Sequence, residues 1–277
     1  MSILEVVALA IVQGITEFLP ISSSGHIVLG AWVLGRDDPG VAFDVAVHLG
    51  TLLAVFVAFR REFWSIARSL LGRRVAADPS GAGASGIPPR RLLLLLAIAT
   101  IPLAIAGVAI RDELDGDLRD PTWVGAFLIG TAVMLWLADR FGRRERGVST
   151  INEGDSLRIG IVQAFAVLPG VSRSGMCIAA GMLEHVNREG AALFSFYLAA
   201  PAIGGAGIWA GYKLAIDGAE AGVSVGEMAL GAAVAFTVAL VAIQGLLALV
   251  RLHSLRVFVV YCLAAGVAVL AARASGL

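Results

Sequence analysis

Long, uninterrupted apolar stretches constrain this chain more than any other feature of its sequence. Each is close to the ~20 residues that a helix needs to cross the ~30 Å hydrocarbon core of a bilayer. They are continuously apolar and do not alternate, so they predict helices and not the strands of a barrel. The stretches are Val41–Phe59, Leu92–Ile110, Trp123–Ala138, Ala191–Tyr212, Met228–Val250 and Val257–Ala272. The sequence therefore predicts an all-α polytopic membrane protein with six transmembrane helices.

Composition supports lipid as the solvent of this chain. Only 15% of the 277 residues are charged, whereas a soluble domain carries about 25%. The net charge is zero, which excludes a strongly basic surface for nucleic acid. Cys177 and Cys262 lie in apolar surroundings, and their separation predicts neither a metal cage nor a disulfide framework. The apolar start at Ile3 lacks a basic segment and a small-residue cleavage site, so we expect mature protein and no signal peptide.

The two halves of the chain resemble each other. A shift of 150 positions aligns Ile11-Val12-Gln13 with Ile161-Val162-Gln163, and it also aligns Ser22, Ser24 and Gly25 with Ser172, Ser174 and Gly175. The serine and glycine matches carry the most weight in a chain so rich in aliphatic residues. We therefore expect one membrane domain, residues 1–277, built from an internal repeat with halves of about 1–138 and 157–277.

Loop charges predict the orientation of these halves. Arginine gathers in the loops 60–91, 140–146 and 251–256, and acidic residues gather in the loops 111–120 and 217–227. Arginine-rich loops stay in the cytoplasm, so the acidic loops are expected to face outward. The stretch Asp78–Pro89 reads as a flexible insertion. Threading the chain through these loops gives the two halves opposite orientations in the membrane.

Two apolar regions, Ile3–Leu34 and Leu157–Leu183, must then begin and end on the same side of the membrane. Clusters of Pro, Ser and Gly interrupt both. We therefore predict two re-entrant helical hairpins, the first entering from outside and the second from inside. Broken helices at membrane depth occur where they are buried in protein or line a wet cavity, and in inverted repeats they build the binding site.

The first hairpin carries the segment VQGITEFLPISSSGH, from Val12 to His26. Gln13 and Glu17 are four apart and share one helical face. Pro20 ends that helix, and the following serines, Ser22, Ser23 and Ser24, are suited to cap the next one. Gly25 and His26 then fall in the first turn of that helix. The serines alone are more typical of helix caps and close packing than of nucleophiles.

The second hairpin carries LPGVSRSGM, from Leu168 to Met176, with Arg173 between Ser172 and Ser174. An inverted pair of hairpins brings two helix N-termini together, and their free N–H groups attract an anion. Arg173 adds a planar charged fork suited to phosphate. Glu17 would repel that phosphate unless it binds a cation such as Mg²⁺ or carries a proton. His26 can move protons at neutral pH or attack phosphorus.

Asp44 and His48 are residues of second rank. They are four apart at the outer end of a predicted span. This spacing lets both face the cavity, and a plain interfacial position fits the pattern equally well.

At these residues the chain resembles the undecaprenyl-diphosphate phosphatase family of the bacitracin-resistance type. The resemblance rests on Gln13 and Glu17 followed by FLPISSSGH, on PGVSRS from Pro169 to Ser174, and on FDVAVHLGT and FSFYLAAPA further along. It extends over essentially the whole length. Two departures stand out: Gln13 occupies a position where many members have Glu, and Cys177 one where many have Thr.

The resemblance implies hydrolysis of undecaprenyl diphosphate to the monophosphate carrier lipid of cell-wall synthesis, and a part in bacitracin resistance. It implies a multi-pass protein of the plasma (inner) membrane, with a site that opens to the outer face. Glu17 would be the essential carboxylate and a metal ligand, and His26 and Ser23 would be the catalytic candidates. Arg173 would anchor phosphate, with Ser22, Ser24, Gly25, Ser172 and Ser174 around it. The expected cofactor is a divalent cation, Mg²⁺ or alternatively Ca²⁺.

Two other classes compete with this interpretation. A transporter or flippase of the polyprenyl phosphate would use the same inverted architecture. A phosphatase of the type-2 phosphatidic-acid kind also uses an SGH motif, but it needs a lysine-arginine motif and a second histidine that this chain lacks at the required spacing. The expected partners are the polyprenyl diphosphate and the bilayer. The sequence leaves open a homodimer, the prenyl chain length, and whether His26, a serine or water attacks.

Overall fold

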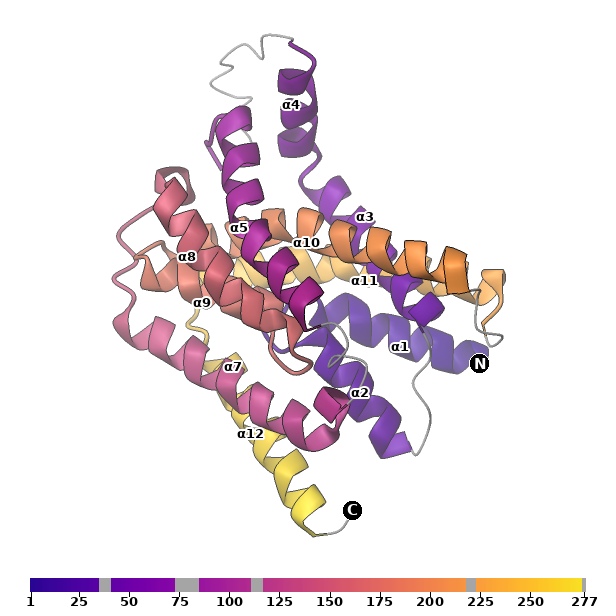
Figure 1. Cartoon of the computed structure of the whole chain (residues 1–277). Coiled ribbons are helices and arrows are strands. Elements are labelled where there is room, and N and C mark those ends of the chain that lie inside the picture. The colour runs from indigo at the N-terminus through magenta and orange to yellow at the C-terminus, as the bar shows by residue number, and fades with distance from the viewer. Residues whose placement is uncertain (35–40, 73–84, 111–116, 218–222, 276–277) are drawn as a thin grey trace.

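Helices make up the fold of the residues that the computed structural model describes, which are 1–34, 41–72, 85–110, 117–217 and 223–275 (Figure 1). The elements are α1 (Ile3–Thr16), α2 (Ser23–Leu34), α3 (Val41–Ala58), α4 (Arg60–Leu70), α5 (Pro89–Ala109), η1 (Asp117–Arg119), α7 (Pro121–Phe141), η2 (Val148–Thr150), α8 (Glu153–Ala164), η3 (Phe165–Val167), α9 (Arg173–Leu183), α10 (Arg188–Asp217), α11 (Val225–Leu252) and α12 (Arg256–Ala274). Within the described ranges the chain forms no β-strand apart from one isolated bridge between Arg146 and Val186, in agreement with the predicted all-α fold.

The helices have the lengths that membrane crossing requires. Five of them, α5, α7, α10, α11 and α12, are long and apolar enough to span a bilayer. A sixth span is counted if α3 and α4 are taken as one, and these two helices meet at an angle of 81°. The sequence did not indicate this bend. It lies at Phe59, which is buried and packs its ring against Phe196 and Tyr197 of α10.

The two regions predicted to be interrupted are each broken into two helices. In the first, α1 gives way to α2 at Pro20 and at Ser22, which adopts a left-handed φ of 72°. In the second, α8 and η3 give way to α9 at Pro169 and Gly170. The second region begins earlier than the predicted Leu157, because Asn152 and Asp155 form a capping box that starts α8 at Glu153.

The two central helices are α9 and α10, and the others pack around them in pairs. Along the chain, α7 lies against α12, α3 against α11, α5 against α8, and α1 against α11. Small residues allow close approach at these crossings. A Cβ on Gly160 of α8 would lie 2.5 Å from the carbonyl oxygen of Ala99, and one on Gly50 of α3 would lie 2.2 Å from that of Ala232.

Large apolar side chains cover the outside of this bundle. They remain exposed on the outer helices, as at Ile105 of α5, Val133 of α7, Val241 of α11 and Val260 of α12. In contrast, polar side chains such as Gln13, Glu17 and Ser174 are buried. A surface that is more apolar than parts of the interior matches hydrocarbon and not water as the surrounding solvent. The chain is therefore an integral membrane protein.

Parts of the loops that predicted orientation lie outside the described residues. These are most of the acidic loop at 111–116, residues 218–222 of the second acidic loop, and residues 73–84, which include most of the expected flexible insertion.

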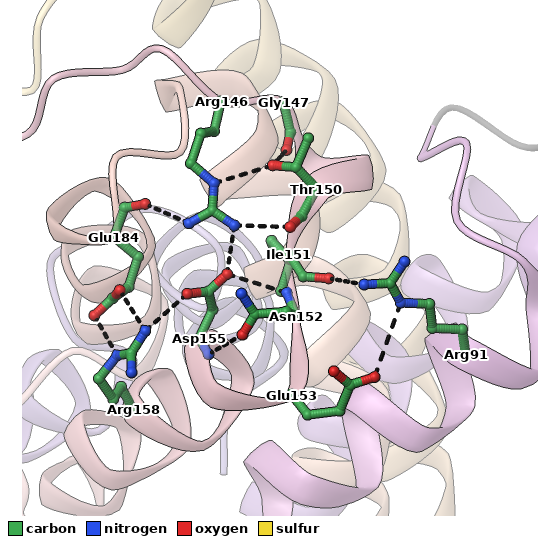
Figure 2. A network of polar contacts seen from close by, with 10 residues as sticks. All are labelled: Arg91, Arg146, Gly147, Thr150, Ile151, Asn152, Glu153, Asp155, Arg158 and Glu184. Atoms are coloured by element: carbon green, nitrogen blue, oxygen red, sulfur yellow. Dashed lines mark hydrogen bonds and ion pairs between the residues drawn. The ribbon is translucent and has the colours of Figure 1, made fainter.

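A network of charged side chains ties together the ends of α8 and α9, as Figure 2 shows. Asp155 of α8 is 2% exposed and accepts hydrogen bonds from Arg146 and, at 2.9 Å, from Arg158. Arg158 also bonds the carboxylate of Glu184 at 2.7 and 2.8 Å. Arg146 further donates to the carbonyl oxygen of Glu184 at 3.0 Å. The network therefore fixes the second hairpin at both of its ends.

Replacing Asp155 with Asn should destabilise the protein at neutral pH. Burial alone would raise the pKa of Asp155, but hydrogen bonds from Arg146 and the Asn152 backbone, with the charges of Arg146 and Arg158, lower the pKa below its ordinary value. The ionised carboxylate therefore stabilises the fold above about pH 4, and this contribution is lost as the pH falls through the lowered pKa. We expect Asp155→Asn to lower the Tm in detergent by about 5–10 °C at pH 7.

The difference in Tm between wild type and Asp155→Asn should shrink at acidic pH. Glu153→Gln is a matched control, because Glu153 is exposed and lies 4.0 Å from Arg91, a geometry that contributes little to stability. Equal Tm values for Asp155→Asn and wild type at pH 7 would show that the network is not needed for stability.

Candidate active site

The break between α1 and α2 turns the chain so that several polar groups face inward. Glu17 is the C-cap of α1, and its backbone N–H still donates to Gln13. Ser22 then caps α2, since its hydroxyl accepts a hydrogen bond from the N–H of Gly25 at 3.3 Å. Among the three serines, Ser22 thus has the expected capping role, which leaves Ser23 free for another.

The break before α9 is built in the same way and is held by α7. Ser172 caps α9 by accepting from the N–H of Gly175 at 3.0 Å. Thr131 of α7 accepts a hydrogen bond from the Ser172 N–H at 3.1 Å and donates one to the Gly170 carbonyl at 3.3 Å. Gly170 has a φ of 99°, and a Cβ there would lie 2.6 Å from the Val124 carbonyl oxygen, so glycine is required for two reasons.

The tips of the two hairpins meet, as their sequence similarity predicts. A Cβ on Gly25 would lie only 3.0 Å from the Cα of Gly170. Ser174 donates to the carbonyl oxygen of Leu19 at 3.0 Å, and Ser22 donates to that of Val171 at 3.4 Å. The N-termini of α2 and α9 therefore lie side by side, with their free N–H groups and positive dipole ends close together.

Glu17 and Arg173 form an ion pair across this junction. Nη2 of Arg173 donates a hydrogen bond to Oε1 of Glu17 at 2.8 Å. The Arg173 side chain is only 12% exposed and that of Glu17 only 7%. Nη1 of Arg173 donates to the carbonyl oxygen of Ser195 on α10 at 3.0 Å. Each charge would be costly to bury alone, so each hairpin stabilises the charged residue of the other.

The second oxygen of Glu17 gathers further polar groups. Ser23 donates its hydroxyl hydrogen to Oε2 at 2.7 Å, and Nε2 of Gln13 donates to the same oxygen at 3.0 Å. The other amide atom of Gln13, Oε1, is buried without a hydrogen-bond partner. A hydroxyl beside a carboxylate is the arrangement of a nucleophile beside a base.

His48 is the imidazole that the structure places beside Glu17. Its Nε2 lies 3.6 Å from Oε2 of Glu17, and its Nδ1 donates to the Asp44 carbonyl oxygen at 2.8 Å. The Asp44 carboxylate lies 3.6 Å from the same ring nitrogen. Of this second-rank pair, His48 contacts Glu17 directly, and Asp44 is linked to the site through His48.

His26 faces a different direction from the one we expected. Its Nδ1 lies 2.7 Å from the Ser22 carbonyl oxygen and its Nε2 lies 2.5 Å from the hydroxyl of Tyr261 on α12. Among the described contacts, none joins His26 to Glu17 or to Arg173. The guanidinium of Arg173 and the carboxylate of Glu17 thus lie together, but the imidazole of His26 does not join them, and that of His48 lies beside Glu17 instead.

Three further groups at the site had no clear signal in the sequence. Tyr261 lies within an apolar run, Thr131 of α7 bonds the backbone of the second hairpin, and Ser195 contributes only a carbonyl oxygen. Cys177 donates its thiol hydrogen to Oε1 of Gln163 at 3.1 Å. It therefore supports the interior of the second hairpin, below the tip where the charges meet.

The junction can bind an anion and one hard cation. Two helix N-termini and Arg173 supply donors and positive charge for a phosphate group. Glu17 and the unpaired oxygen of Gln13 supply oxygen ligands of the kind Mg²⁺ prefers. Within the described ranges, His, Cys, Asp and Glu form no group of three or more that could hold a metal by themselves, so water and substrate oxygens would have to complete its coordination.

This chain is similar to known proteins over most of its length. Residues 6–268 match the family described as bacitracin resistance protein BacA. An undecaprenyl-diphosphatase of Desulforudis audaxviator is 40% identical over 266 residues, which cover 96% of each chain. One of Trichlorobacter lovleyi is 39% identical over 280 residues, which cover 100% of this chain and 99% of that one. One of Moorella thermoacetica is 41% identical over 208 residues, 75% of this chain and 76% of that one.

Proposed function

Since the chain belongs to the bacitracin resistance protein BacA family, we infer that it is an undecaprenyl-diphosphatase. It hydrolyses undecaprenyl diphosphate to undecaprenyl phosphate and inorganic phosphate, and so recycles the carrier lipid of cell-wall synthesis. One observation links this function to particular residues. Nη2 of Arg173 in one hairpin lies 2.8 Å from Oε1 of Glu17 in the other, beside two helix N-termini.

We propose that the diphosphate binds at the junction of the hairpin tips while its prenyl chain stays among the apolar helices. Arg173 turns its fork from Glu17 toward phosphate, and the N–H groups at the starts of α2 and α9 bind the remaining oxygens. These groups stabilise the charge that develops when the bond between the terminal phosphorus and the bridging oxygen breaks. The bridging oxygen then leaves with the lipid as undecaprenyl phosphate.

A divalent cation, Mg²⁺ or alternatively Ca²⁺, completes this proposal. Glu17 would hold it, with Oε1 of Gln13 beside it, because that buried oxygen has no hydrogen-bond partner of its own. The cation supplies positive charge that offsets the repulsion between Glu17 and the diphosphate. Gln13 contributes an oxygen without a second negative charge, so one carboxylate is enough for this arrangement.

The attacking group is Ser23, His26 or water. Ser23 is supported by its hydrogen bond to Glu17, which could accept the hydroxyl proton. His26 is supported by the lone pair of one ring nitrogen at the edge of the site. In the case of water, either residue would remove its proton.

We further propose that α1–α2 and α8–α9 are re-entrant hairpins of an inverted repeat. The helix pairs support this, since the packing of α1 against α11 corresponds to that of α8 against α5, and α7 packs against its own counterpart α12. Arginines of α4 and the network at Arg146 lie on the side expected to be cytoplasmic. The site then opens to the outer face of the plasma membrane.

A transporter or flippase would use the same junction without breaking a phosphate bond. Phosphate release from purified undecaprenyl diphosphate in detergent separates the two functions, since a pure flippase releases none. The relatives are undecaprenyl-diphosphatases by name, which favours the phosphatase.

Replacing Arg173 with Ala should lower phosphate release by about 10²–10³-fold, because the main cationic donor to phosphate is lost. Arg173→Lys should fall between this variant and wild type, since it keeps the charge but loses the planar fork. Arg251→Ala is a matched control, as it removes an arginine from an exposed ion pair with Glu189 at 2.6 Å and should leave turnover unchanged.

The Tm of each variant must be measured alongside its turnover, because removing Arg173 leaves the Glu17 carboxylate buried and unpaired. A folded Arg173→Ala protein with near-normal phosphate release would contradict the assignment of Arg173.

Chelation of divalent cations should abolish phosphate release, and added Mg²⁺ should restore it. Glu17→Gln should not be restored at the same Mg²⁺ concentration, because it lacks the only carboxylate proposed as a ligand. Direct binding of Mn²⁺, followed by electron paramagnetic resonance, provides a readout besides activity. Full turnover after chelation would exclude a required cation.

Trapping a phosphoenzyme distinguishes the three attacking groups. We expect an acid-labile phosphoenzyme that His26→Gln lacks if His26 attacks, and an acid-stable one that Ser23→Ala lacks if Ser23 attacks. Rapid quenching with labelled substrate, followed by acid treatment, makes this measurement. No trapped species at any time point would indicate direct attack by water.

A further inference from the structure

Tyr261, in α12, contacts the imidazole ring of His26 from outside the two hairpins. Its hydroxyl oxygen lies 2.5 Å from Nε2 of His26. The two rings are nearly parallel, with an angle of 10° between them and 5.6 Å between their centroids. Tyr261 is 43% exposed. The phenol therefore meets His26 at the edge of the site and not deep within it.

The hydrogen bonds of His26 determine which nitrogen carries the proton. Nδ1 lies 2.7 Å from the carbonyl oxygen of Ser22, and a carbonyl oxygen can only accept, so Nδ1 is the donor. The neutral ring then has its lone pair on Nε2, where it accepts the hydroxyl hydrogen of Tyr261. Nε2 is thus the nitrogen that can attack phosphorus or take a proton from water, and Tyr261 sets its direction.

Packing fixes the position of Tyr261 on α12. The next residue, Cys262, is fully buried, and its thiol lies 3.6 Å from the carbonyl oxygen of Pro20. Two consecutive residues of α12 therefore contact the break itself, at Pro20, and the first turn of α2, at His26. In addition, α12 packs along α7, whose Thr131 holds the tip of the second hairpin. The same pair of helices thus positions both tips.

We propose that Tyr261 is a positioning residue that keeps Nε2 of His26 at the edge of the proposed phosphate site. Its hydroxyl holds the ring in one orientation before substrate binds. When the diphosphate binds, the hydroxyl transfers its hydrogen bond to a phosphate oxygen, and the Nε2 lone pair is then free to react. The effect of Tyr261 on turnover rests on the proposed function, but its hydrogen bond to His26 does not.

Tyr261→Phe tests this assignment, because it removes the hydroxyl and keeps the ring. The chain has four histidines, so ¹⁵N-histidine NMR of the protein in detergent resolves few signals, and His26→Gln identifies those of His26. We expect the Nε2 signal of His26 to move in Tyr261→Phe toward that of a nitrogen without a hydrogen bond, while the other histidine signals stay in place.

The same variant should release phosphate with a kcat lowered about tenfold and a KM within about twofold of wild type, as expected for a lost hydrogen bond that orients a reacting group. Tyr212→Phe is the matched control, because Tyr212 is an exposed tyrosine of α10 that packs against Trp209. It should change neither kcat nor the His26 signals.

In a His26→Gln background, Tyr261→Phe should cause no further loss of kcat, since Tyr261 acts through His26. An unchanged Nε2 signal, or a wild-type kcat in folded Tyr261→Phe, would overturn the proposal. A wild-type protein that released no phosphate would instead overturn the phosphatase function, and the NMR comparison would still decide whether Tyr261 holds His26.

Discussion

The ion pair between Glu17 and Arg173 is the interaction on which the arrangement of the site depends. A carboxylate and a guanidinium at this depth in an apolar bundle are tolerated because they are paired and hydrogen-bonded. The pair joins residues 156 positions apart in the chain, so it can form only when both breaks adopt their turns and both tips meet. The charged site is therefore complete only when both hairpins are folded.

This pairing also explains how a negatively charged residue can lie at the proposed diphosphate site. While the site holds no diphosphate, Glu17 neutralises Arg173, and Ser23 and Gln13 satisfy its second oxygen. In the binding mode proposed above, a phosphate group would compete for the guanidinium and leave the carboxylate to the proposed divalent cation. In that proposal the charged groups would have partners both before and during binding, and the bundle would bury no uncompensated charge.

The sequence predicted those parts of the site where a residue type is unfavourable in its surroundings unless the structure uses it. Charges such as Glu17 and Arg173 within apolar segments, and Pro20 or Gly170 within helices, are costly unless the structure uses them, so they identified the two breaks and the central pair. A tyrosine such as Tyr261 is ordinary in an apolar helix, and every residue has a backbone carbonyl like that of Ser195. Neither contact was therefore predictable from the sequence. The direction of His26 depends on a partner 235 residues away. The bend between α3 and α4 depends on packing at Phe59.

The two hairpins differ in how deeply they are embedded. Nearly all of α9 is buried, and the charged network at Asp155 fastens its hairpin at the far end, whereas α2 is only partly buried along most of its length. Substitutions near Arg173 will therefore disturb the scaffold together with the chemistry, but substitutions at Ser23 or His26 can separate the two. For mutational work, the first hairpin is the half in which a loss of activity can be attributed to chemistry, and the second is the half in which it must first be distinguished from misfolding.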